Sequence, residues 1–281
     1  GHPQGRRVIL KGGRDPSKHV LRIGNHDGVV VDGGAAICLE GLTLEGDTKT
    51  HNGVAASDGA TVFLRRVVIK GFNTGASIGQ NSRLEADGVD VIANEGYAGF
   101  HAYAGSSCLL TKCSASNRST SKTKELTFGF AAWFSSTMEC HNCKSSGWYN
   151  GYFAGHAASI DVEASDAIEN VFGGGAYLDS TLRAIRSTFS ESREIGLTFH
   201  QATGMIGDCR LRDNPIGLRC LGGSMVDLRD RPCEISGARI GVQSLAGGIL
   251  VGVRPAFRDC NQEQEIYSYK TAEEAVFQFD K

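Results

Sequence analysis

The 281 residues carry 29 Lys and Arg against 31 Asp and Glu, a balance that favours neither a nucleic acid nor an anionic membrane as partner. No apolar run approaches the roughly 20 residues of a membrane-spanning helix, so no membrane insertion is expected. The nine cysteines are an odd number, which argues against a complete disulfide framework and for thiols assembled in a reducing compartment.

The two ends of the chain differ from its middle. The sequence begins at Gly1 without a methionine, and we interpret it as part of a longer protein whose localisation is left open. Residues 1–30, with the strand-like run "RRVILKG", are expected to form an irregular N-terminal region. Residues 31–262 should form the main domain and residues 263–281 a short C-terminal cap, in which "TAEE" at 271–274 has the pattern of a helix capping box.

The main domain is built from an internal repeat. A glycine followed by apolar residues at alternate positions recurs nine times, at Gly53, Gly75, Gly99, Gly129, Gly151, Gly173, Gly196, Gly217 and Gly241. An apolar anchor follows nine residues after each glycine, at Val62, Leu84, Cys108, Met138, Ile160, Leu182, Met205, Val226 and Leu250. Successive anchors lie 21 to 30 residues apart, which is the period of stacked coils.

The alternation inside each repeat defines the fold class. Apolar and polar residues alternate with period two, which indicates short strands with one buried face. An earlier copy reads Ile37, Leu39, Leu42 and Leu44. Such strands at this period predict an all-β, right-handed parallel β-helix of roughly ten coils. A leucine-rich horseshoe has a similar period, but its leucine and asparagine consensus is missing here.

The repeat also predicts which side chains face outward. Residues at the second and fourth positions after the glycine point away from the core, and in several coils they are rings: His101, Tyr103, Trp133, Phe153, Tyr177 and His200. A contiguous row of exposed rings is typical of a binding surface, and flat rings suit the apolar faces of sugars. With His156 in the following turn, these are the predicted binding residues for a polysaccharide or cell-surface glycan. An oligomer interface explains the same rings.

A second outward column carries acidic residues. Glu139 and Asp161 fall on neighbouring coils, where like charges are unfavourable unless something compensates them. With Glu163, they are the predicted catalytic residues of a glycoside hydrolase, one as acid and another as nucleophile or base. An ion pair between Asp161 and Arg183 explains the same pattern. A polysaccharide lyase is less favoured, and its candidate bases are Lys122, Lys124, His156 and Arg183.

Two further features bear on ligands. The spacing of Cys140 and Cys143 is seen in zinc sites, but both thiols are expected to face the core, so neither a metal nor another cofactor is predicted. The longest coil contains the insertion "NRSTSKTKEL" at residues 117–126. This polar segment is expected to overhang the rings, as a groove wall or as a solvated loop.

The coils "NEGYAGFHAYAGSSCLLTKCSASN" and "YNGYFAGHAASIDVEASDAIEN" resemble repeats of the pectate-lyase-like right-handed β-helix superfamily. They are most similar to the tailspikes of bacteriophages and prophages. The resemblance implies a polysaccharide groove outside the ring-bearing strand, catalytic carboxylates in hydrolytic members, and often a homotrimer. The aspartate motifs of polygalacturonases, the Asp-Pro-His motif of epimerases and the calcium aspartates of pectate lyases have no clear counterpart. A depolymerase, a non-catalytic glycan-binding module and a structural protein therefore all remain open.

Overall fold

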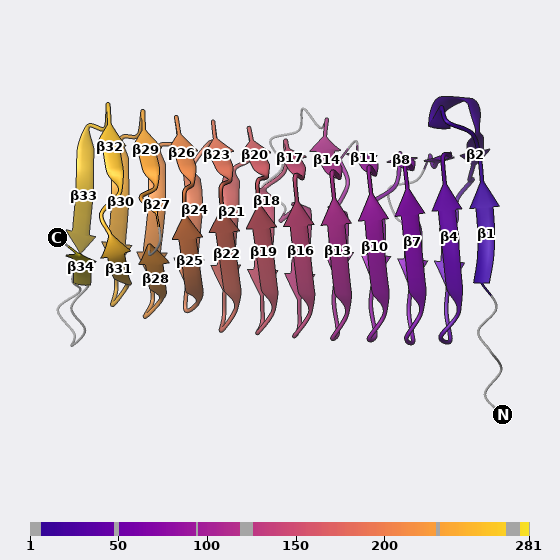
Figure 1. The fold of residues 1–281 in the computed structure, drawn as a ribbon, viewed down its shortest axis with the longest axis horizontal. Helices are drawn as coiled ribbons and strands as arrows, with labels where there is room; N and C mark the ends of the chain where they lie inside the picture. Colours follow the sequence, from indigo (N-terminus) through magenta and orange to yellow (C-terminus); the bar gives the residue numbers. More distant parts are fainter. Residues whose placement is uncertain are drawn as a thin grey trace.

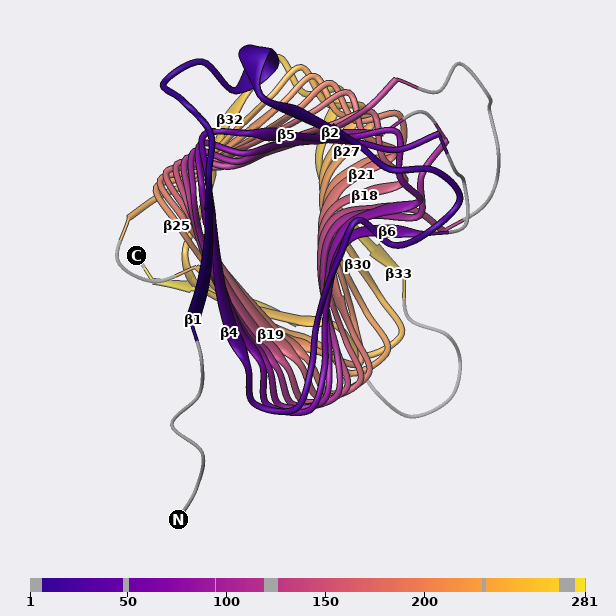
Figure 2. The ribbon, with the colours of Figure 1, turned by 90° about the vertical axis from the view of Figure 1, so that its right-hand side faces the viewer.

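The computed structural model describes residues 7–47, 51–93, 95–118, 126–228, 231–267 and 276–280. Their strands form three parallel sheets along the length of the molecule, and each turn of the chain adds one strand to each sheet (Figure 1). Seen from the end, the sheets are the walls of a three-sided tube (Figure 2). The predicted all-β parallel β-helix of roughly ten coils is confirmed.

We name the three walls sheets A, B and C. Sheet A contains β1 (Arg7–Lys11), β4 (Ala36–Glu40), β7 (Thr61–Arg65), β10 (Arg83–Asp87), β13 (Ser107–Thr111), β16 (Thr137–His141), β19 (Ser159–Glu163), β22 (Thr181–Ile185), β25 (Thr203–Gly207), β28 (Met225–Leu228), β31 (Ile249–Val253) and β34 (Val276–Asp280). Sheet B contains β2 (Val20–Arg22), β5 (Thr43–Glu45), β8 (Val68–Lys70), β11 (Asp90–Ala93), β14 (Ser114–Asn117), β17 (Lys144–Ser146), β20 (Asp166–Ile168), β23 (Thr188–Ser190), β26 (Arg210–Arg212), β29 (Glu234–Ser236) and β32 (Ala256–Arg258). Sheet C contains β3 (Val29–Val31), β6 (Asn52–Ala56), β9 (Thr74–Ile78), β12 (Ala98–Ala102), β15 (Phe128–Trp133), β18 (Asn150–Gly155), β21 (Phe172–Tyr177), β24 (Ile195–His200), β27 (Ile216–Leu221), β30 (Ile240–Leu245) and β33 (Gln262–Tyr267).

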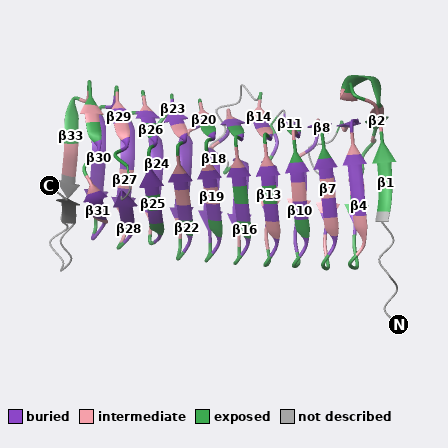
Figure 3. Ribbon diagram, viewed as in Figure 1, coloured by how far each residue is buried: buried purple, intermediate pink, exposed green. Residues whose placement is uncertain are grey.

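The core fills the inside of the tube. Alternate residues of each strand point inward, and in the middle coils these positions are buried (Figure 3). Eight of the nine predicted anchors are buried there. Rings also stack inside: Phe130 lies between Phe100 and Tyr152, with centroids 5.2 and 4.9 Å away. The apolar repeat therefore builds one continuous core from coil to coil.

The remaining anchor, Met205, lies on the opposite side of its strand from the one predicted. Leu182 pairs with Gly204, so Met205 points outward and is 42% exposed. The turn before β25 is one residue shorter than the turn before β22, which shifts the offset from nine to eight. A Cβ at Gly204 would lie 2.6 Å from the ring of Phe199, so this ring occupies the space that an anchor side chain would need.

The repeat glycines lie where the chain enters sheet C. They are skipped by the strand pairing, as between β15 and β18. A Cβ on Gly129 would lie 2.7 Å from the carbonyl oxygen of Gly151, and one on Gly151 would lie 2.3 Å from that of Gly173. The same contact recurs in each coil from Gly28 to Gly241. Close approach of neighbouring backbones thus explains why the repeat requires glycine.

The two ends extend the ladders. β1 pairs with β4, and β34 pairs with β31. In the described residues, β33 and β34 thus continue sheets C and A where a cap was expected, while the capping-box residues 271–274 lie outside the described part. The N-terminal region also holds the 3-10 helix η1 (Pro16–Lys18). Of the helices that the structure describes, none has the length and apolar character needed to cross a membrane.

Candidate functional site

Two outward rows of side chains follow the register predicted for sheet C. The first row contains His101, Ala131, Phe153, Gly175 and Thr198. The second row contains Trp133, Gly155, Tyr177 and His200. Tyr103 follows β12 at the start of the second row. Strand pairing therefore brings the ring-bearing positions of consecutive coils side by side, as the repeat indicates.

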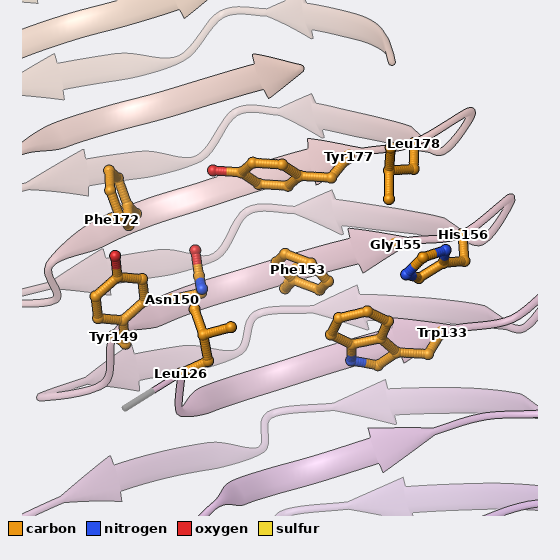
Figure 4. Close-up of a pocket in the computed structure, with 10 residues that line it drawn as sticks. All are labelled: Leu126, Trp133, Tyr149, Asn150, Phe153, Gly155, His156, Phe172, Tyr177 and Leu178. Atoms are coloured by element: carbon orange, nitrogen blue, oxygen red, sulfur yellow. The ribbon is translucent and has the colours of Figure 1, made fainter. Parts of the chain in front are cut away.

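The rings of the central coils surround a groove on the outer face of β15, β18 and β21 (Figure 4). The groove has a volume of about 320 Å³. It is lined by Leu126, Trp133, Tyr149, Asn150, Phe153, Gly155, His156, Phe172, Tyr177 and Leu178. Tyr149 and Phe172 lie at one end, where strands begin, and His156 and Leu178 lie at the other end, in the turns that follow β18 and β21.

Phe153 forms the floor of the groove. Its ring centroid lies 4.6 Å from that of Trp133 and 5.3 Å from that of Tyr177, on which it stacks at 21°. Gly155 makes this packing possible, because a Cβ there would come within 2.7 Å of the Phe153 ring. Phe153 is only 6% exposed. The prediction that it is an exposed ring is therefore wrong, since its neighbours in adjacent coils close over it.

Two polar atoms of the groove residues are buried without partners. Trp133 Nε1 and Asn150 Oδ1 have no hydrogen-bond partner among the described residues. Asn150 is only 2% exposed, and its carboxamide lies between Tyr149 and Phe153 (Figure 4). Buried polar groups are nearly always hydrogen-bonded, and an unmade bond costs about 1–3 kcal/mol. Two residues that line the groove therefore each hold a polar atom, one donor and one acceptor, that is covered and left unpaired by the described residues.

The remaining predicted binding residues lie beside the groove. Tyr103 leans over Gly79 of the preceding coil, and its ring stacks on His101 at a centroid distance of 5.2 Å. His200 contacts Tyr177 edge-on at 6.1 Å. Burial lowers the pKa of His101 to about 4 and raises the pKa of Tyr177 to about 12. The predicted single ribbon is thus divided, because Tyr103 and Trp133 lean toward opposite neighbouring coils.

The first outward row changes from aromatic to polar side chains toward the C-terminus. Beyond Thr198 it continues with Arg219, Gln243 and Glu265. Arg219 Nε donates to Gln243 Oε1 at 2.7 Å, and the Gln243 amide donates to the Glu265 carboxylate. Desolvation lowers the pKa of the Arg219 guanidinium. Along the axis of the tube, the aromatic surface therefore gives way to a polar ladder.

The predicted catalytic acids lie on a different wall. Glu139 and Asp161 pair on adjacent strands, as expected, but they belong to sheet A, which faces away from sheet C (Figure 2). Arg183 Nη1 lies 2.7 Å from Asp161 Oδ2, so the alternative ion pair is present. Glu139 is 61% exposed, and its Oε2 lies 3.7 Å from Nε2 of His141.

Glu163, the third predicted acid, has two partners. It forms an ion pair with Arg186, and its Oε2 lies 3.3 Å from Nδ1 of His141. None of the three acids lines the groove. The structure brings the acids together with one another but not with the rings, and their catalytic role stays a prediction.

The Cys140 and Cys143 pair belongs to the core. Both side chains are buried, and Cys143 Sγ lies 3.5 Å from the carbonyl oxygen of Leu110. Burial raises the pKa of the Cys140 thiol, which disfavours the thiolate that a metal ion would bind. Within the part of the chain that the structure describes, no three His, Cys, Asp or Glu side chains are grouped to hold a metal ion.

Sequence reasoning missed half of the groove. Tyr149, Asn150, Phe172 and the turn residue Leu178 were not proposed, and Leu126 was considered only as part of the inserted loop. The residue directly before each repeat glycine forms a third outward row: Thr74, Ala98, Phe128, Asn150, Phe172, Ile195, Ile216 and Ile240. Reading that position along the repeat would have found Asn150 and Phe172.

Comparisons with known proteins agree with this architecture. The sequence matches the family described as "Right handed beta helix region" over residues 17–167, more than half of the chain. A search of curated proteins gave no match. The A-module of mannuronan C-5 epimerase AlgE6 from Azotobacter vinelandii is similar in structure, with TM-score 0.56 and 12% identity over 99% of this chain and 90% of that one. The A-module of AlgE4 from the same organism gives TM-score 0.54 and 13% identity over 95% and 88%. At these identities the likeness shows the fold alone.

Proposed function

We propose that this chain, which belongs to the right-handed β-helix family, binds a polysaccharide in the groove on the outer face of sheet C. The observation that carries the proposal is the pair of unpartnered buried atoms, Trp133 Nε1 and Asn150 Oδ1, in a groove walled by rings. A sugar hydroxyl both accepts and donates hydrogen bonds. Sugar hydroxyls would satisfy both atoms once the side chains that cover them shift, while the apolar face of the sugar packs on Trp133 or Tyr177.

The chemistry of the lining favours an uncharged sugar unit at this position. Among the described lining residues there is no Asp, Glu, Lys or Arg. Recognition therefore relies on stacking and on neutral hydrogen bonds, in which the side chains of Asn150, Tyr149 and Tyr177 can take part. The fold neighbours named as mannuronan epimerases act on a polysaccharide, and they support a polysaccharide ligand on this type of solenoid; mannuronan is itself charged, so the preference for an uncharged sugar rests on the lining alone.

Binding without cleavage is the form of this function that the observations support best. No carboxylate lines the groove, and Asp161 is neutralised by Arg183. We expect Glu139→Gln and Asp161→Asn to keep the affinity of the wild type, and a panel of neutral and acidic polysaccharides to keep its chain length on size-exclusion chromatography. Shortening of any polysaccharide that either substitution abolishes would instead establish the glycoside hydrolase, including a tailspike-like depolymerase.

Trp133 provides the direct test of the groove. Trp133→Ala removes both the platform and the donor, and we expect affinity for the bound polysaccharide to fall at least tenfold, about 1.4 kcal/mol. Trp133→Phe keeps a ring but loses Nε1, and it should give a smaller loss. Isothermal titration calorimetry against the best binder of the panel measures both, with Leu109→Ala on sheet A as an exposed apolar control.

The competing hypothesis is that the groove is a contact between copies of this chain, as in the predicted homotrimer. Its apolar lining, with the exposed side chains of Leu126 and Leu178, also suits protein. Light scattering separates the two hypotheses. A trimer that Trp133→Ala converts to monomers, together with no glycan binding by the wild type, would contradict the proposed function.

A further inference from the structure

The turns from sheet C to sheet A share an unusual backbone. In nine successive coils a residue near the start of this turn has a positive φ, namely Asp58, Gln80, Ala104, Phe134, His156, Leu178, Gln201, Gly222 and Ala246. This left-handed conformation disfavours bulky side chains and suits glycine, asparagine and aspartate. Phe134 adopts it with a φ of 51°. Since Ala104 fills the same position one coil earlier, the turn itself does not require an aromatic residue.

Phe134 is also poorly buried for its size. Its side chain is 56% exposed, so it contributes little to the core. The positive φ recurs at this turn in nine coils and does not single out Phe134. The exposed ring does, because exposed apolar side chains that join a larger apolar surface are typical of binding sites. The identity of its contacts indicates which function the ring serves.

The ring of Phe134 extends the aromatic wall of the groove. It stacks on His156 at a centroid distance of 4.9 Å and an interplanar angle of 19°. His156 in turn stacks on Trp133 at 5.4 Å and 25°. His156 and Trp133 lie at the same end of the groove (Figure 4). The aromatic surface therefore continues without a break from the groove onto the turn.

The groove itself is elongated along the strands of sheet C. Its lining runs from Tyr149 and Phe172, where strands begin, to His156 and Leu178, where strands end. Along the axis of the tube, by contrast, the outward row becomes the polar ladder of Arg219 and Gln243. Along the axis the ring surface is limited to the coils of Trp133, Phe153, Tyr177 and His200, whereas along the strands it continues from the groove onto the turn at Phe134.

We propose that Phe134 and His156 form a second sugar platform, so that the polysaccharide lies along the strands and leaves the groove over the turn between sheets C and A. The occupant is a pyranose ring that presents its C–H face to Phe134, in the same chain as the sugar held by Trp133 and Asn150. This inference rests on the proposed function of the groove and adds the path of the polymer and a further binding residue.

The substitution Phe134→Asn separates binding from stability. Asparagine tolerates the left-handed turn better than phenylalanine, so we expect the midpoint of urea unfolding to stay unchanged or to rise. Affinity for long oligosaccharides should fall about five- to tenfold, because the outer sugar loses its platform. The shortest oligosaccharide that the wild type binds fills only the groove, and its affinity should not change. Gln80→Asn, at the same turn position outside the groove, controls for the backbone effect.

Calorimetric titration with a length series of oligosaccharides, prepared from the polysaccharide that binds best, gives the result. Affinity of Phe134→Asn equal to that of the wild type at every length, with Trp133→Ala impaired, would overturn the second platform and leave the groove intact. An equal loss at every length would also overturn it, because Phe134 would then belong to the groove itself. Unimpaired binding by Trp133→Ala, or no glycan binding by the folded wild type, would overturn both proposals.

Discussion

Gly151→Ala is expected to destabilise the protein by about 3 kcal/mol or more. A Cβ at this position would lie 2.3 Å from the carbonyl oxygen of Gly173, which is backbone of the next coil and unable to turn aside as a side chain could. It would also lie 2.9 Å from Nδ2 of the Asn170 side chain. The two coils would have to separate, and the hydrogen bonds between β18 and β21 would lengthen. A lower urea midpoint and a lower Tm measure the effect.

Gly24→Ala is the matched control. A Cβ at Gly24 meets no atom within 4 Å, so this substitution should change the stability by less than about 1 kcal/mol. We expect the change to be stabilising, because alanine reduces the conformational entropy of the unfolded chain. Equal effects of the two substitutions would contradict the explanation of the glycine repeat by close backbone approach.

The second large effect is a dependence of the free energy of unfolding on pH, caused by His101. Burial holds the pKa of His101 at about 4 in the folded protein, whereas an unfolded histidine titrates near 6.5. Between these values the unfolded chain binds the extra proton, so the stability falls as the pH falls from about 6.5 to about 4. The full shift corresponds to about 3 kcal/mol. Above pH 7 both states are neutral at this residue, and its contribution no longer changes.

His101→Gln isolates this contribution from that of the carboxylates, which titrate in part of the same range. Urea unfolding at half-unit pH steps between 7.5 and 4.5 should give a shallower loss of stability for the variant than for the wild type. Parallel curves for the two proteins would show that the imidazole is hydrated in the folded state and that its pKa is not depressed.

The period of the sequence repeat predicts much of the fold. The nine glycines and eight buried anchors follow from it, because each coil must place the same backbone against its neighbour. The register of Glu139 with Asp161 follows for the same reason. Met205 could not be placed this way, because the turn before β25 is one residue shorter and Phe199, in the same repeat, fills the space beside Gly204.

The site was less predictable than the fold. The pattern indicates which side chains leave the core, but not which neighbours then cover them, and so it does not predict the burial of Phe153. It also does not give the angle at which a turn redirects the chain, so the wall that carries the acids cannot be placed relative to the wall that carries the rings. Asn150 lies directly before a repeat glycine, and the alternation that follows the glycine does not extend to this position.

The direction of the ladders has a mechanical consequence. Every sheet joins one coil to the next through hydrogen bonds that run along the length of the tube (Figure 1). A force that pulls the two ends apart would act on the interfaces between coils in series. The weakest interface would open first, and the coils would then separate one after another. A force applied across the tube would be shared by all coils at once. The molecule should therefore be weak in tension along its axis and stiff against squeezing from the side.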